Sequence, residues 1–450
     1  MNEKRHTATV LFVLFCAVLF NSAQAEATGP LTLDQAISTA LKDSPLVRSN
    51  TYEAEASTHG KKAAMGQLLP QLNSYAGYTR LSDPSAVVPI KELGGTPPLF
   101  SRDHYSYGLS MKIPIFEGGR LWARLSAAEI SEAISRETLH LTRQELIAGI
   151  TNTFNQILYL EKLTESQRAT LNALKKAKAD AEVRLSVGRI PEVDLMRMET
   201  QVAEQEQALV SAEEATVRAR QLLSQMMGKD PSWSPQITGR LSPPSDSDHP
   251  AKPSAIPEMN LSIRPDIRRA MKQVELAKAE VRQAMGYHLP SVDLVGDYGR
   301  RAGSGFAGDE EVWTGGIQLS LNIFSGGSAE AGVRQARAKL LAAEERLRNT
   351  RLNAMTEVAS AISSLREAKA RYRVAEKNLT TAKETWRIED LKYKAGAGTI
   401  TDSLLAQSAW FQAEAGKLLA LYEYHAAKVA WRLATGVIDS DYQASQGKSH

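Results

Sequence analysis

One stretch of the chain has the spacing of a dinucleotide-binding loop. Gly303, Gly305 and Gly308 form the pattern G-x-G-x-x-G, which in nucleotide-binding folds leads from a strand into a helix whose N-terminus holds a pyrophosphate. Here the pattern is followed by Asp309, Glu310 and an alternating, strand-like stretch instead of a helix. The glycines therefore predict a loop between two strands, not a cofactor site.

Residues suited to metal or nucleophilic chemistry do not form working groups. The 8 histidines are scattered along the chain, with no paired-ligand spacing for zinc and no serine partner for a hydrolytic site. Cys16 is the single cysteine, and it lies in the apolar N-terminal stretch. We expect no enzyme, no cofactor and no metal site, and the small net charge of +3 indicates no nucleic-acid partner.

Two aspartates follow glycines at equivalent places. Asp194 comes six residues after Gly188, and Asp402 comes six residues after Gly396. A carboxylate that starts a helix interacts favourably with the positive end of the helix dipole, so both aspartates can be simple caps. In an oligomer, one aspartate per chain around an axis would instead form a ring of negative charge that selects cations or narrows a pore. The sequence leaves both interpretations open.

The N-terminus has the three parts of a secretory signal. Lys4 and Arg5 precede an apolar run over 10–20, which is followed by Ala23-Gln24-Ala25. The run is about half of the roughly 20 residues that a membrane-spanning helix needs. The sequence predicts an exported protein with a signal peptide over 1–25.

An internal duplication organises the rest of the chain. Ile115-Phe116-Glu117-Gly118-Gly119 recurs 208 positions later as Ile323-Phe324-Ser325-Gly326-Gly327. Gly188 and Gly228 meet Gly396 and Gly436 at the same offset of 208. Upstream, Leu69-Pro70 matches Leu289-Pro290 at an offset of 220, so the first copy has 12 more residues in its loop. Both halves are therefore expected to build the same unit.

The predicted domains follow from these landmarks. A first repeat covers 26–228, a Pro-rich linker 229–257, a second repeat 258–436 and a C-terminal tail 437–450. Each repeat is predicted to contain an initial helix, a β-hairpin (72–116 or 292–324), a long helix (120–187 or 328–395) and a return helix (191–227 or 401–435).

The hairpins alternate apolar and polar residues. In the first copy Tyr105, Leu109 and Ile113 share one face, and in the second copy Trp313, Ile317 and Leu321 do. Strands of about ten residues with an aromatic at one end are typical of membrane β-barrels. Four strands cannot close, because barrels begin at about eight strands, so the chain must oligomerise if they cross a membrane. A dimer would be enough for closure, and the pattern leaves the number of copies open.

The long helices have the seam of a coiled coil. Ile147, Ile150, Phe154 and Ile157 follow a 3, 4, 3 spacing, and Met355, Val358, Ile362 and Leu365 repeat it 208 residues later. A helix of this length would extend about 100 Å at roughly 1.5 Å per residue. The sequence thus predicts a mainly helical protein with a few membrane strands.

Taken together, these features resemble the TolC-like outer-membrane efflux family. The resemblance rests on the export signal, the duplication, the Ile-Phe-x-Gly-Gly passage and the Val187-Gly188 tip with Asp194 beyond it, and it covers nearly the whole mature chain. It implies a homotrimer with a 12-stranded β-barrel in outer-membrane lipid, continued by a 12-helix periplasmic barrel. It further implies a channel of a tripartite efflux or type I secretion system, working with a periplasmic adaptor (membrane fusion) protein and an inner-membrane RND or ABC pump.

The resemblance also assigns roles to particular residues. The helix tips that would contact the adaptor are Val187, Gly188, Arg189, Ala395, Gly396 and Ala397. The periplasmic gate would comprise Tyr393, Asp402, Leu405 and Asp194, and Gly118, Gly119, Gly326 and Gly327 would form the strand–helix turns. Gly398 stands where the family pattern has an arginine, and Leu405 where it has a second acid, so we expect a weaker or apolar gate.

One alternative belongs to another class of protein. A periplasmic coiled-coil adaptor or scaffold without a pore would also have a long α-hairpin. Such proteins usually carry one hairpin per chain and have no use for four strands with lipid-type faces. The duplication therefore favours the channel.

Overall fold

The computed structural model describes residues 30–89, 99–245, 261–305 and 310–439. The predicted signal peptide, the last part of the predicted linker (246–257) and most of the tail lie outside these residues. The chain divides into two compact units, which are described separately. Among the described residues, the tip unit comprises 30–40, 150–243 and 378–422, and the sheet unit comprises those within 41–149, 244–377 and 423–439.

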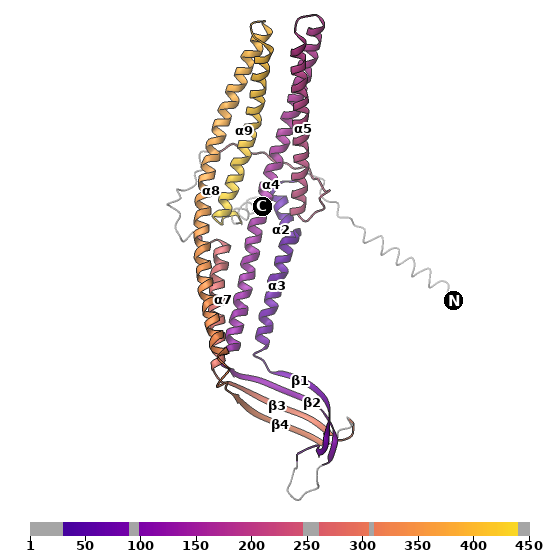
Figure 1. Cartoon of the computed structure of the whole chain (residues 1–450), viewed down its shortest axis with the longest axis vertical. Coiled ribbons are helices and arrows are strands. Elements are labelled where there is room, and N and C mark those ends of the chain that lie inside the picture. Colours follow the sequence, from indigo (N-terminus) through magenta and orange to yellow (C-terminus); the bar gives the residue numbers. More distant parts are fainter. Residues whose placement is uncertain (1–29, 90–98, 246–260, 306–309, 440–450) are drawn as a thin grey trace, which may run out of the picture. The chain divides into compact units, whose positions relative to one another are not determined.

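Each half of the chain has two strands followed by a long helix and a shorter one (Figure 1). The elements of the first half are α2 (Leu33–Asp43), α3 (Pro45–Gly66), β1 (Gln71–Ala86), β2 (Phe100–Glu117), α4 (Arg120–Ser186) and α5 (Glu192–Met226). Those of the second half are α7 (Pro265–Met285), η2 (Gly286–His288), β3 (Ser291–Ala302), β4 (Glu310–Ser320), α8 (Ser328–Lys394) and α9 (Ile400–Ala434). This order confirms the predicted fold class, a duplicated strand-strand-helix-helix unit in a mainly helical chain.

The long helices have the same length in both halves. α4 and α8 each contain 67 residues, and α5 and α9 each contain 35. Both long helices are free of proline, which would remove a backbone donor and break the helix. Within the described residues, no helix is both long and apolar enough to cross a membrane.

Glycine ends the helices because the chain must turn there with positive φ. Gly188 and Gly396 both have φ of 73°. After Gly188, the N–H of Arg189 donates to the carbonyl of Arg184 at 2.8 Å, and after Gly396 the N–H of Ala397 donates to that of Lys392 at 2.9 Å. These are the bonds of the Schellman motif, which satisfies the last carbonyls of a helix.

The turn from strand to long helix also requires glycines. Gly118 and Gly119 have φ of 62° and 76°, and Gly326 and Gly327 have φ of 63° and 80°. Residues with a Cβ rarely adopt this region. At Gly118 space is short as well, since an added Cβ would lie 2.3 Å from the carbonyl oxygen of Gly286.

The predicted coiled-coil seam is buried in the first copy and shifted in the second. Ile147, Ile150, Phe154 and Ile157 are all buried. In the second copy Val358, Ile362 and Leu365 are buried, but Met355 is 43% exposed and its neighbour Ala354 is buried instead. The prediction for Met355 was wrong, because the small Ala354 faces the core at that turn of α8.

The four strands form one antiparallel sheet in the order β1-β2-β3-β4. β1 pairs with β2 and β3 pairs with β4, as two hairpins. β2 pairs with β3 from Tyr105↔Ala302 to Glu117↔Ser291, which joins the two repeats into a single sheet. Gly303 and Gly305 directly follow strand β3, and the next element along the chain is strand β4, not a helix. Gly308 lies outside the described residues.

One strand ends earlier than its alternation predicted. The predicted second hairpin extended to residue 324, whereas β4 ends at Ser320. Ser320 pairs with Ser291, the first residue of β3, so among the described residues Ile323 and Phe324 have no strand beside them. In the first half, Phe116 remains in a strand because it pairs with Val292.

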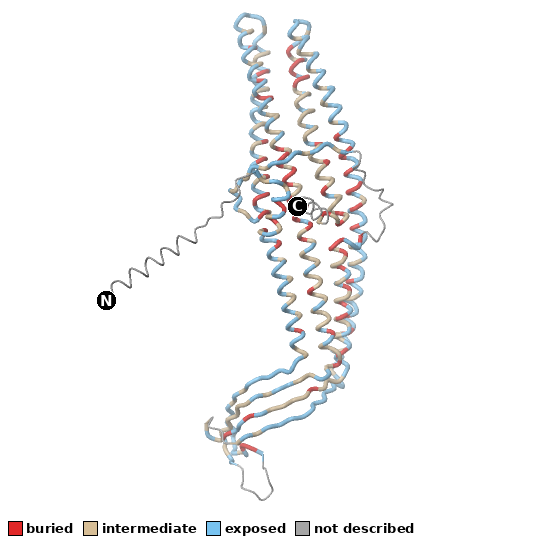
Figure 2. The backbone as a smooth tube through the Cα atoms, turned by 180° about the vertical axis from the view of Figure 1, so that it is seen from behind, coloured by how far each residue is buried: buried red, intermediate tan, exposed pale blue. Residues whose placement is uncertain are grey.

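One face of the sheet is apolar and exposed. Tyr298 pairs with Trp313, and Leu294 pairs with Ile317. Trp313 is 73% exposed and Ile317 is 72% exposed, and most of the sheet is drawn pale blue or tan in Figure 2. An exposed apolar face of this extent marks a surface that another apolar phase or chain covers.

The other face is polar and is crossed by a tyrosine. The hydroxyl of Tyr75 on β1 donates to Oδ1 of Asp297 on β3 at 2.9 Å, so its side chain extends over β2. Gly108 and Gly299 leave room for it, because a Cβ at either glycine would lie within 3.0 Å of the Tyr75 hydroxyl. This contact ties three strands together.

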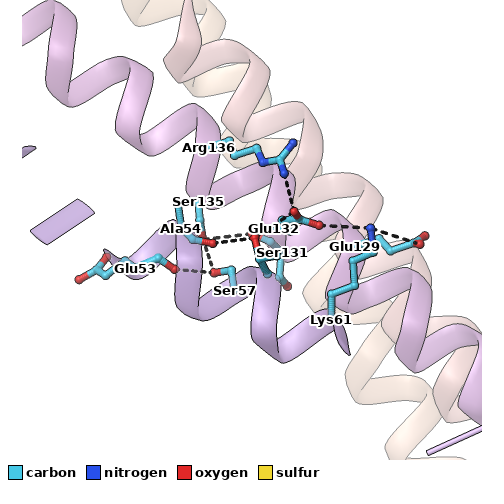
Figure 3. Close-up of polar contacts among 10 residues, drawn as sticks. Glu53, Ala54, Ser57, Lys61, Glu129, Ser131, Glu132, Ser135 and Arg136 are labelled. Atoms are coloured by element: carbon cyan, nitrogen blue, oxygen red, sulfur yellow. Dashed lines mark hydrogen bonds and ion pairs between the residues drawn. The ribbon is translucent and has the colours of Figure 1, made fainter. Parts of the chain in front are cut away.

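A buried carboxylate joins α3 to α4 in the sheet unit (Figure 3). Glu132 accepts a hydrogen bond from the Thr58 hydroxyl at 3.1 Å and from Arg136 at 2.6 Å, and Lys61 lies 3.3 Å away. The hydrogen bond from Thr58 lowers the pKa of Glu132 most, and Lys61 and Arg136 lower it further against the opposing effect of burial. The contact therefore favours the ionised carboxylate.

This pKa shift predicts a loss of stability in acid. A carboxyl group with a lowered pKa stabilises the fold above its unfolded-state pKa of about 4.3 and loses that contribution as the pH falls through the folded value. We expect Glu132→Gln to melt at a lower temperature than the wild-type protein at pH 7 and to differ less from it at pH 3. Heat unfolding followed by circular dichroism measures both. Glu53→Gln, an exposed change on α3, serves as the control, and an equal difference at both pH values would contradict the prediction.

Candidate functional site between the two helix tips

The site is a groove between two helix turns of the tip unit. One tip joins α4 to α5 through Gly188, and the other joins α8 to α9 through Gly396. Together they line a hollow of about 710 Å³. Its walls are formed by Arg184, Arg189, Ile190, Pro191, Asp194 and Arg197 from the first tip and by Tyr393, Lys394, Gly396, Gly398, Thr399, Ile400 and Thr401 from the second.

An arginine bridges the two tips. Nη1 of Arg197 on α5 donates to Oγ1 of Thr401 on α9 at 2.5 Å. The same nitrogen lies 3.5 Å from Oδ1 of Asp194, whose side chain is 14% exposed. One turn further on, Nε2 of Gln201 is 3.5 Å from the carbonyl oxygen of Leu404. α5 and α9 are thus linked by side chains from the first repeat.

A second arginine covers the tyrosine of the opposite tip. The guanidinium carbon of Arg184 lies 5.5 Å from the ring centroid of Tyr393, within the distance of a cation–π contact. The ring also packs against a small core that contains the buried residues Ala181, Met198, Ile400 and Leu404. An apolar core and the polar contacts of Arg184 and Arg197 therefore both hold the two tips together.

The groove is strongly basic. Its lining includes Arg184, Arg189, Arg197 and Lys394 against the single carboxylate of Asp194. Lys394 pairs with Asp390 at 2.6 Å, outside the lining. The lining of the groove therefore contains more cationic side chains than carboxylates.

The predicted gate residues lie in two places. Tyr393 and Asp194 both line the groove. Asp402 accepts a hydrogen bond from the Thr399 hydroxyl at 2.6 Å, and its own N–H donates to Thr399 Oγ1 at 3.2 Å, so it completes a cap at the start of α9. Leu405 is 65% exposed and lies outside the groove lining. The six predicted tip residues, Val187, Gly188, Arg189, Ala395, Gly396 and Ala397, are all exposed.

Sequence reasoning missed Arg184, Arg197 and Thr401. The family pattern has an arginine where this chain has Gly398. In the structure, the arginines that line the groove come from the first repeat instead. The signal was present, because Arg197 comes three residues after Asp194 on one helical face. Its partner Thr401 is 204 residues away, however, so only the fold brings them together.

Comparison with known proteins gives a consistent result. The family model described as "Outer membrane efflux protein" matches residues 36–229 and 256–437. The chain is 26% identical over 403 residues to the pyoverdine export outer membrane protein OpmQ of Pseudomonas aeruginosa. This alignment covers 86% of this chain and 81% of that protein. It is 22% identical over 413 residues to outer membrane protein TolC of Escherichia coli, covering 88% and 80%.

Solved structures show the same fold. The outer membrane channel CmeC of Campylobacter jejuni matches with a TM-score of 0.80 at 19% identity, covering 90% of this chain and 85% of that one. VceC of Vibrio cholerae matches with a TM-score of 0.76 at 20% identity, covering 90% and 96%. At this level of identity the likeness concerns the fold.

The bridge between the tips predicts a local effect of one substitution. Arg197→Met keeps the length of the side chain but removes the donors to Thr401 and the charge beside Asp194. A lost hydrogen bond of this kind is worth about 1 kcal/mol, so amide exchange over 395–404 should accelerate roughly fivefold. Hydrogen exchange followed by mass spectrometry measures this.

The matched control is Arg168→Met, because Arg168 pairs with Glu213 at 2.6 Å within the first hairpin alone. It should leave exchange over 395–404 unchanged. Equal acceleration in both variants would show that Arg197 does not hold the second tip.

Proposed function

The chain belongs to the outer membrane efflux protein family, and from this premise we propose that three copies form one channel that docks with a periplasmic adaptor. The protein is an outer-membrane channel of efflux and secretion systems, with a large periplasmic extension. Its family consists of channel proteins, and the proposal assigns the chain no catalytic step.

The unfinished sheet is the observation that carries the proposal. Among the described residues, β1 and β4 each have a strand on one side only. Backbone groups at such edges have no partner, and lipid supplies none. Pairing β4 of one copy with β1 of the next satisfies both edges, and three copies of four strands give a 12-stranded barrel. Its exposed apolar face, with Trp313 and Ile317, would then contact outer-membrane lipid.

The helices continue the same arrangement. Each copy contributes two helical hairpins, α4 with α5 and α8 with α9. The long helices α4 and α8 have the same length, and so do the shorter helices α5 and α9. Along the chain, α3 directly precedes β1, and α7 with the short η2 precedes β3. Three copies would make six similar hairpins around one axis, a 12-helix periplasmic barrel.

The tips are the proposed docking and gating end. The exposed residues Val187, Gly188 and Arg189 of one tip and Ala395, Gly396 and Ala397 of the other would meet the adaptor, which links the channel to an inner-membrane RND or ABC pump. The bridge from Arg197 to Thr401 and the contact of Arg184 with Tyr393 would hold the two hairpins of one chain together in the closed state. Opening would separate them.

Two measurements test the proposal as a whole. The protein extracted from outer membranes in mild detergent should migrate as a trimer before heating and as a monomer after it. Reconstituted in a planar bilayer, it should conduct ions. A soluble monomer without conductance would favour the alternative of a coiled-coil scaffold and would overturn the channel.

The gate gives a separate prediction. If Leu405 and its copies narrow the pore with apolar side chains, Leu405→Ala should raise the single-channel conductance by a factor of about two or more, because a wider and less apolar constriction wets more easily. Single-channel recording measures the change. Leu419→Ala, another exposed leucine on α9 but distant from the tip, is the control. Unchanged conductance in Leu405→Ala would refute the apolar gate, but it would not contradict the proposal that the protein is a channel.

A further inference from the structure

We propose that a hollow inside the first helical hairpin binds a small neutral phenol. The hollow belongs to the tip unit but is a different site from the groove, because its walls come from residues of 161–172 on α4 and 213–220 on α5. It has a volume of about 510 Å³. Since one hairpin supplies the whole lining, the inference depends neither on the number of copies nor on an adaptor.

Two ion pairs cross the hairpin at the hollow. Nη2 of Arg220 on α5 lies 2.7 Å from Oε1 of Glu161 on α4, and Nη2 of Arg168 on α4 lies 2.6 Å from Oε1 of Glu213 on α5. On each helix the two members are seven residues apart, which is about 10 Å at roughly 1.5 Å per residue. The two pairs thus cross the hairpin on either side of the middle of the hollow.

The second hairpin has two tyrosine rings at the equivalent positions. At the offset of 208, the counterparts of Thr164 and Thr216, which line the hollow, are Tyr372 and Tyr424. Tyr372 is 4% exposed and Tyr424 is 1% exposed, so both rings are buried there. Because threonine is much smaller than tyrosine, the first hairpin lacks the volume that these two phenol rings occupy in the second. The hollow therefore offers space for a ring of the kind that the chain itself supplies in its other repeat.

Two buried polar atoms of the lining have no hydrogen-bond partner among the described residues. They are Nε of Arg220, which is a donor, and Oγ1 of Thr164, which can donate or accept. A buried polar group without a partner costs free energy, so a ligand that supplies the missing bonds is favoured. A phenolic hydroxyl that enters beside these side chains can accept from Arg220 and donate to Thr164. The ring itself would lie beside the guanidinium groups of Arg168 and Arg220, as in a cation–π contact.

The charges of the lining favour a neutral ligand. Arg168 and Arg220 are each paired with a glutamate. The third carboxylate of the lining, Glu165, pairs with Lys162 at 2.6 Å, outside the lining. An anion would have to separate an arginine from its glutamate, whereas a phenol, with a pKa of about 10, is neutral at pH 7. An aliphatic alcohol would bring the hydroxyl without the flat ring that stacks on a guanidinium group.

The probe for the test is 4-fluorophenol, and its binding to the full-length protein in detergent at pH 7 is followed by fluorine NMR. It should bind with a Kd of about 1 mM or tighter, as befits so small a molecule, and saturate at one molecule per chain. 4-Fluoroanisole, which has no hydroxyl proton to donate, should bind about fivefold more weakly. Unlabelled phenol should displace the probe, and cyclohexanol should need a concentration about fivefold higher to do so.

Substitutions locate the binding. Thr164→Tyr combined with Thr216→Tyr gives the first hairpin the residues of the second, so it should abolish saturable binding of 4-fluorophenol. Thr200→Tyr, the same change at an exposed position of α5, is the matched control and should leave the affinity unchanged. Arg220→Lys keeps a positive charge beside Glu161 but removes the Nε donor, so it should weaken the probe about fivefold. In the wild-type protein the probe should also slow amide exchange over 161–172 and leave 369–380 unaffected.

Several results would overturn the inference. Equal binding by the wild-type protein and the double tyrosine variant would place the probe in the detergent or elsewhere on the chain. Displacement by phenol and by cyclohexanol at the same concentration would show an apolar pocket without selectivity for a phenol, and absence of saturable binding would show a hollow that holds only water. If the double variant does not fold, Arg220→Lys decides, because an affinity equal to that of the wild-type protein contradicts the proposed hydroxyl contact.

Discussion

Backbone hydrogen bonding at the edges of the sheet is the constraint on which the rest of this structure depends. In an apolar medium each N–H or C=O group without a partner costs several kcal/mol, so a sheet in such a medium must close or be covered. β2 and β3 meet in the middle of the sheet and join the two repeats, which leaves the free edges at β1 and β4. Both long helices begin within a few residues of strands β2 and β4, after a pair of glycines. The start of each long helix is thereby tied to the end of a strand through a turn of only a few residues.

The duplication makes the helical part regular. Two helices of 67 residues and two of 35 place their terminal glycines in the same register, and Gly188 and Gly396 end their helices with the same φ and the same pair of backbone bonds. This equality is local in origin, because a Schellman motif needs only a glycine and the preceding turn. Long hairpins of matched length are therefore encoded twice in the sequence, independently of the partner chains.

Local patterns in the sequence predicted most of the fold, and contacts between the repeats account for what they missed. Alternation and glycine position were sufficient for the four strands and the long helices, since both depend on neighbouring residues. The end of β4 was not predictable from alternation, because it depends on where β3 begins. Met355 was assigned to the seam from its spacing, but burial depends on which side of α8 faces its neighbours. Tyr393 and Asp194, which were expected at the gate from their position, both line the groove, and their role in a gate stays a prediction. Arg197 was not expected there, because its contact with Thr401 joins residues of different repeats. The structure shows Asp402 in the cap at the start of α9, where it accepts a hydrogen bond from Thr399. Its role in the gate stays a proposal.

The differences between the repeats extend beyond the tips. In the first hairpin Lys178 pairs with Glu199 at 3.0 Å. Its counterpart 208 residues later is Trp386, which instead stacks on Trp410 with ring centroids 4.6 Å apart. If six identical hairpins formed the assembly, every substitution would appear in all six of them. A chain that contains two hairpins can alter one of them and keep the other, so the proposed trimer would alternate two kinds of surface around its axis. Arg197 makes a polar contact with Thr401 inside one chain, whereas its counterpart Leu405 is an exposed apolar side chain, so the duplicated positions differ in the contacts that they can make.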